Sequence, residues 1–118
     1  MKKIISLCLL LLTLCQSHWV FAHAVITDYS LKITPIHANQ PDKVELSFNS
    51  KIELGLSQVF LVSKGDKHEL LQVSNGGKQG QIVIHIPALA SGDYALRFKV
   101  FAADGHLTED VIHFSVSQ

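Results

Sequence analysis

The sequence predicts an all-β domain: a Greek-key β-sandwich or barrel of about seven strands with an immunoglobulin-like arrangement. Short segments rich in Val, Ile, Phe and Leu follow one another, and several alternate apolar with polar residues. Turn residues separate these segments at the spacing expected of a small sandwich. Helical periodicity is hard to find, so an α-helical core is not expected.

The first half of the domain contains four expected strands. One falls within residues 24–33, and the alternation of residues 44–48 gives the second strand one buried and one wet face. Residues 58–63 and 68–73 flank a Lys-Gly-Asp-Lys turn and predict a hairpin. The pattern of residues 51–56 leaves a short turn of helix open as an alternative.

The second half supplies three more strands. In residues 82–86 three isoleucines point one way and His85 the other, which predicts that His85 faces outward. The apolar rows of residues 94–100 and 112–116 predict the last two strands, joined by a turn at residues 102–106.

The first 22 residues have the three parts of a secretory signal peptide. Met1-Lys2-Lys3 supplies a positive start, residues 4–14 an apolar run, and Val20-Phe21-Ala22 a small-x-small cleavage pattern. The apolar run is about half of the roughly 20 residues that cross a bilayer, so a retained anchor is not expected. Cleavage after Ala22 would leave one domain, residues 23–118, that begins with His23.

The mature region would contain no sulfur ligand and no disulfide, because Cys8, Cys15 and Met1 all lie in the leader. Soft thiol and thioether ligands, which Cu(I) prefers, are therefore absent from it. Without Lys2 and Lys3, eight basic residues stand against ten acidic ones, a formal charge of −2. This balance provides no electrostatic footprint for nucleic acid or an anionic membrane surface.

Two separate features suggest a metal site. A free amine and an imidazole on one residue, His23, form a ready-made chelate. Far along the chain, Asp104 and His106 stand two residues apart, so in an extended strand they project to the same side, and Gly105 allows a tight turn. An isolated triplet of this kind is more often an Asp-Gly turn with a hydrogen-bonding histidine.

The C-terminal stretch as a whole resembles the CopC family of periplasmic copper-binding proteins. The likeness rests on a Gly-x-Tyr strand start, an Asp-Gly-His turn, an apolar-x-Phe-x-Val end and a mature start at His23-Ala24. The residues that carry it are Gly92, Tyr94, Leu96, Phe98, Val100, Asp104, Gly105, His106, Phe114 and Val116, with Pro41, Val44, Leu46 and Phe48 earlier in the chain. The sequence departs from the family at Tyr29-Ser30-Leu31, Thr34 and Asp110, and it lacks the methionine-rich Cu(I) loop.

The resemblance implies a Cu(II)-only member that binds one Cu(II) ion per mature chain through the His23 amine and Nδ1, His106 and Asp104. Three nitrogens and one oxygen suit the tetragonal preference of Cu(II), and Zn(II) is the rival ion. The resemblance further implies a periplasmic monomer, not an enzyme, that sequesters copper or delivers it to a CopD-type inner-membrane partner in copper homeostasis or resistance.

Two other functions stay open from the sequence. An N-terminal histidine brace is also the copper site of lytic polysaccharide monooxygenases, although the anionic Asp104 argues against that enzyme. A metal-free immunoglobulin-like interaction module is the plainest alternative. The remaining histidines of the mature region are expected to face solvent; they are His37, His68, His85 and His113. Two acidic residues after the turn, Glu109 and Asp110, are candidates to orient a ligand imidazole through a hydrogen bond.

Overall fold

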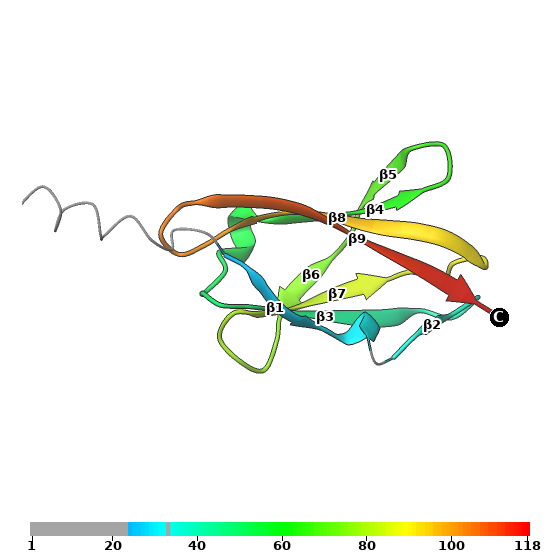
Figure 1. Ribbon diagram of the computed structural model, residues 1–118, viewed down its shortest axis with the longest axis horizontal. Helices are drawn as coiled ribbons and strands as arrows, with labels where there is room; N and C mark the ends of the chain where they lie inside the picture. Colours follow the sequence, from blue (N-terminus) through cyan, green and yellow to red (C-terminus); the bar gives the residue numbers. More distant parts are fainter. Residues whose placement is uncertain (1–23, 33) are drawn as a thin grey trace, which may run out of the picture.

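The computed structural model describes residues 24–32 and 34–118, which form two β-sheets stacked face to face (Figure 1). One sheet has the strand order β1-β3-β7-β6 and the other β2-β9-β8-β4-β5. The strands are β1 (Ile26–Tyr29), β2 (Ile36–His37), β3 (Asp42–Phe48), β4 (Gln58–Ser63), β5 (Lys67–Leu70), β6 (Val73–Asn75), β7 (Gln81–Ile86), β8 (Gly92–Phe101) and β9 (Leu107–Ser117). The all-β sandwich prediction is confirmed.

The strand order is that of an immunoglobulin domain. Strands β1, β3, β7 and β6 correspond to the A, B, E and D strands, and β4, β8 and β9 to C, F and G. Tyr94, near the start of β8, donates its hydroxyl to the Ala90 carbonyl at 2.8 Å. This contact repeats the tyrosine corner of such domains, in which a tyrosine fixes the chain entering strand F.

The prediction of one strand at residues 68–73 is wrong, because two strands share this segment. The chain instead passes from one sheet to the other there, so that β5 pairs with β4 and β6 pairs with β7. Leu71 lies at this crossing, where it is buried and donates its N–H to the Val59 carbonyl at 2.9 Å. A single segment with apolar Leu70, Leu71 and Val73 therefore serves two sheets, which alternation alone does not reveal. The described residues contain nine strands rather than about seven because of this division and the two-residue β2.

The core lies between the sheets and is built from the alternating rows expected from the sequence. Phe48 and Phe98, one from each sheet, meet edge to face with ring centroids 6.0 Å apart. Buried apolar side chains surround them, among them Val44, Leu46, Val59, Leu61, Ile82, Ile84, Ile86, Leu96 and Val100. Burial of these side chains supplies the driving force for folding in a region without cysteine.

The short turn of helix left open for residues 51–56 is present as one 3-10 turn, η2 (Leu54–Leu56), after β3. A second 3-10 turn, η1 (Ser30–Lys32), follows β1. Within residues 24–32 and 34–118, no helix is long and apolar enough to cross a membrane. The expected leader, residues 1–22, and the first candidate ligand, His23, lie outside the described residues.

Candidate metal centre

The candidate ligands Asp104 and His106 lie in the turn between β8 and β9. This turn is a tight hairpin loop: Gly105 donates its N–H to the Ala102 carbonyl at 2.9 Å, and Ala102 donates to the His106 carbonyl at 3.0 Å. The last loop position needs a left-handed backbone, and Gly105 has φ 89° there. The hairpin therefore closes at this point because glycine occupies the position whose left-handed backbone other residues rarely adopt.

The turn brings the carboxylate and the imidazole together. Asp104 Oδ2 lies 3.2 Å from His106 Nδ1, and Asp104 Oδ1 accepts the His106 backbone N–H at 3.1 Å. This backbone hydrogen bond is the largest cause that lowers the pKa of Asp104 below its usual 3.8. The Asp104 carboxylate is therefore held ionised and oriented, with one oxygen on the backbone and the other beside the ring.

The donor pair fits a metal ion that enters from solvent. The side chains of His106 and Asp104 are 51% and 46% exposed, respectively. Two ligands on adjacent corners of a tetragonal site, with bonds of about 2.0 Å, lie about 2.8 Å apart. The observed 3.2 Å between oxygen and nitrogen is close to that separation. Imidazole nitrogen and carboxylate oxygen are both ligands that divalent copper accepts.

A short connection, residues 49–53, supports the turn from behind. Ala103 in the loop donates its N–H to the Lys51 carbonyl at 2.9 Å, and Glu53 donates to the Phe101 carbonyl at 2.8 Å. Between these contacts, Ile52 and Ala102 form an isolated antiparallel bridge. The β8–β9 turn is thus held to the neighbouring chain on both sides of its tip, although its ligand side chains stay exposed.

The start of the described chain lies at the same end of the sandwich as this turn (Figure 1). The Ala24 side chain is fully buried. Ala24, Val25 and Ile26 line a shallow hollow together with Phe98 and residues 107–110, the first part of β9. Residue 24 therefore lies at the same hollow as the first part of the strand that begins directly after His106, while the C-terminus lies at the opposite end in Figure 1.

The structure brings Asp104 and His106 together but does not describe the third predicted ligand, His23. Among the described residues, no group of three or more His, Cys, Asp or Glu side chains could hold a metal ion.

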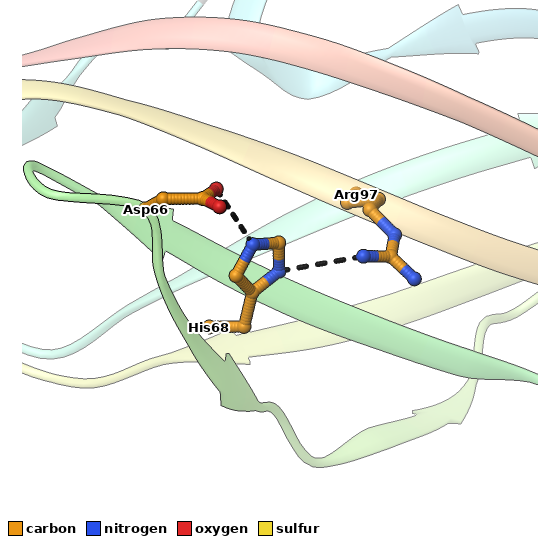
Figure 2. A network of polar contacts seen from close by, with 3 residues as sticks. All are labelled: Asp66, His68 and Arg97. Carbon is orange, nitrogen blue, oxygen red and sulfur yellow. Dashed lines mark hydrogen bonds and ion pairs between the residues drawn. The ribbon is translucent and has the colours of Figure 1, made fainter.

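His68 is committed to a different network (Figure 2). Its Nε2 lies 2.8 Å from Asp66 Oδ1, and Arg97 Nη1 lies 3.5 Å from its Nδ1. Because arginine only donates, Nδ1 is the acceptor in the second contact, and both ring nitrogens are engaged. Arg97 also lies over the Phe60 ring at 5.4 Å. A second metal site at His68 would displace these contacts and face a guanidinium.

The other histidines and the acidic pair do not join the site. His85 is half-buried, with its Nε2 3.2 Å from the Ser74 hydroxyl, while His37 is exposed at the far end of the second sheet. His113 is exposed and lies opposite Ala95, seven residues beyond His106. Glu109 lies 3.9 Å from Lys99 Nζ, and Asp110 Oδ1 accepts the Val111 N–H at 2.8 Å.

One residue with a direct role at the chain start was not predicted. The side chain of Asn49, directly after β3, accepts a hydrogen bond from Val25 N–H at 2.9 Å. An exposed asparagine at the end of a strand is ordinary in a sequence, and its partner lies 24 residues away. Only the pairing of β1 with β3 reveals the contact.

Comparison with known proteins decides the family. A family model described as the CopC domain matches residues 31–117. The chain belongs to the CopC family. The match includes Asp104 and His106 and begins after His23, and it confirms the family resemblance that the sequence motifs indicated. No curated protein matches the chain.

Solved CopC-type structures share the fold of this family member. The crystal structure of CopC from Methylosinus trichosporium OB3b has 27% identity and a TM-score of 0.67, covering 80% of this chain and 94% of that one. PcoC from Escherichia coli, described as a methionine-rich copper resistance protein, has 21% identity and a TM-score of 0.60, covering 81% and 100%. Superoxide reductase (neelaredoxin) from Ignicoccus hospitalis has 13% identity and a TM-score of 0.50, covering 80% and 79%. The latter two likenesses concern the fold alone.

Proposed function

We propose that this CopC-family chain is a periplasmic Cu(II)-binding protein whose leader, residues 1–22, is removed on export. The mature domain, residues 23–118, binds one Cu(II) ion through the His23 amine and Nδ1, His106 and Asp104. The observation that carries the proposal is the Asp104–His106 contact at 3.2 Å, formed at the end of the sandwich where the described chain starts.

Covalent geometry supports the participation of His23. Adjacent Cα atoms across a trans peptide bond are about 3.8 Å apart. Since Ala24 is buried and lines a hollow together with the first part of β9, a residue bonded to it would begin near the β8–β9 turn. Residues from opposite ends of the sequence can therefore contribute to one ion without rearrangement of either sheet.

The available donor atoms support Cu(II) rather than Cu(I). The proposed mature chain has no cysteine and no methionine, whereas PcoC is described as methionine-rich. The proposed set contains three nitrogens and one carboxylate oxygen, which favour the tetragonal Cu(II) ion over soft Cu(I). Cu(II) also lies above Zn(II) in the affinity order for a given divalent site.

The proposed role is binding and transfer, not catalysis. The ionised Asp104 carboxylate would stabilise Cu(II) relative to Cu(I), which works against a redox cycle. The two exposed ligand side chains allow the ion to enter and leave from solvent. The protein would sequester copper or pass it to a CopD-type inner-membrane protein in copper homeostasis or resistance.

Competition titration of the exported protein with Cu(II) tests this function, after intact mass has established that the chain begins at His23. His106→Ala and Asp104→Asn each remove one proposed ligand. We expect His106→Ala to weaken binding by more than the roughly 10–100-fold that loss of a residue supporting a ligand costs. Asp104→Asn weakens binding less, because an amide oxygen retains the geometry without the charge.

His113→Ala is the matched control, since it removes an exposed histidine from β9, the strand that follows the turn, and leaves the turn itself unchanged. It should leave the Cu(II) affinity unchanged. Equal affinity in the parent and in His106→Ala would reject the proposed site, and so would a comparable loss in His113→Ala.

A further inference from the structure

We propose that Asn49 is a positioning residue that fixes the start of the mature chain so that its terminal chelate faces the β8–β9 turn. This inference rests on the proposed function. It arises from a pair of hydrogen bonds between Asn49 and Val25, two residues after His23.

Asn49 holds both polar backbone groups of Val25. Its backbone N–H donates to the Val25 carbonyl at 3.0 Å, which continues the ladder between β1 and β3. The reciprocal bond of a regular antiparallel pair would run from Val25 N–H to the Asn49 carbonyl. Here Val25 N–H donates instead to the side-chain Oδ1 at 2.9 Å. The Asn49 side chain therefore takes the place of its own backbone carbonyl at the last pair of the ladder.

Asn49 also begins the connection that supports the β8–β9 turn. Further along the same connection, Lys51 accepts from Ala103, and Glu53 donates to the Phe101 carbonyl. The segment of residues 49–53 is thus bonded to the chain start at one end and to the Asp104 turn at the other. Through this segment, Asn49 sets where the chain start lies relative to Asp104 and His106.

The two bonds also determine which atoms near the chain start can reach a copper ion. A terminal amine that is free to turn can present the backbone nitrogens that follow it to the same ion. In this chain the Val25 nitrogen is held in the ladder by Asn49 Oδ1, and the buried Ala24 resists the chain movement required. With these two positions fixed, the proposed chelate at the terminal residue would draw its other ligands from the β8–β9 turn rather than from the backbone nitrogens that follow it.

Asn49→Ala in the full mature protein tests this role, with Thr27→Ala as the matched control. Thr27 Oγ1 donates to the Ser47 carbonyl at 3.2 Å, a side-chain contact between the same two strands that does not involve Val25. We expect Asn49→Ala to weaken Cu(II) binding roughly 10–100-fold, as loss of a residue that orients a ligand does. Thr27→Ala should bind like the parent.

A spectroscopic measurement separates positioning from general stability. The visible and paramagnetic resonance spectra of the Cu(II) complex are recorded for each protein under one set of conditions at neutral pH. In Asn49→Ala the spectrum should show a second coordination mode that the parent lacks. Asn49→Asp keeps an acceptor oxygen for Val25 N–H, so its spectrum should return to that of the parent even if Asn49→Ala folds poorly.

Parent-like affinity and spectrum in Asn49→Ala would overturn the inference. An equal loss of affinity in Thr27→Ala would overturn it too. So would a spectrum of Asn49→Asp that differs from the parent spectrum as much as the spectrum of a folded Asn49→Ala does. Failure of the proposed function looks different. In that case the parent binds no Cu(II), or His106→Ala binds it as well as the parent does.

Discussion

At the scale of single residues, the sequence predicted that Asp104 and His106 converge, for a reason that was only partly right. They were expected to meet as i and i+2 residues of a strand. In the structure, Asp104 lies in the loop, and His106 lies at the end of the loop, where its carbonyl accepts the Ala102 N–H. A hydrogen bond from the His106 backbone N–H to the Asp104 carboxylate brings that carboxylate to the ring. The Asn49 contact was not predictable, because it depends on the register of two distant segments.

The same backbone hydrogen bond yields a prediction for the metal-free protein. The His106 N–H holds the pKa of Asp104 below 3.8, so the folded state binds a proton here less readily than the unfolded chain, whose aspartates titrate near ~3.9. The stabilisation is present above that unfolded value and is lost as the pH falls through the lowered one. The carboxyl carbon chemical shift of Asp104 should therefore titrate with a midpoint below 3.8. A midpoint at or above the unfolded value would contradict the geometry.

At the scale of elements, the sequence predicted strands well where one strand serves one sheet. The rows of β3, β7 and β8 alternate and bury one face, as expected. The segment at residues 68–73 was misread because the chain changes sheets at Leu71, where hydrogen-bond partners, not side-chain pattern, end one strand and begin the next. The parallel pairing of β2 with β9 likewise depends on tertiary contacts between two residues and a distant strand.

Two glycines in turns give a prediction with an internal comparison. Gly80 and Gly105 both have left-handed backbones, with φ 82° and 89°. A Cβ at Gly105 would meet nothing within 4 Å, whereas a Cβ at Gly80 would lie 2.6 Å from the Phe48 carbonyl oxygen. Gly105→Ala should cost about 1–2 kcal/mol through backbone strain alone. Gly80→Ala should cost more, because the β3 backbone must also move.

Denaturant unfolding of the two variants measures these free energies. Gly105→Asn is a useful companion, because asparagine tolerates the left-handed region better than alanine and should recover part of the loss. Equal destabilisation by Gly80→Ala and Gly105→Ala would show that the crowding at Phe48 does not matter. No loss in Gly105→Ala would contradict the assigned loop conformation.

At the scale of the whole molecule, the sandwich places two distant parts of the sequence at one end. The immunoglobulin strand order puts β1 and β9 in different sheets, and Ala24, just before β1, lines one hollow together with residues 107–110 of β9. Fold class, family and the proximity of Asp104 to His106 followed from the sequence because each depends on local pattern or motif. The resemblance also implied that the chain start approaches the turn, and the packed structure adds where it lies: Ala24 lines a hollow with residues 107–110, at the same end of the sandwich as the turn.

The central claim is that the free amine of His23 binds the copper ion, and one measurement tests it most directly. Cu(II) affinity is compared between the mature protein and the same protein acetylated at the His23 amine. Acetylation converts the amine into an amide nitrogen, adds no new amine and leaves both sheets unchanged. We expect the affinity to fall by at least the roughly 10–100-fold typical of a damaged metal site. Equal affinities in the two proteins would contradict the account.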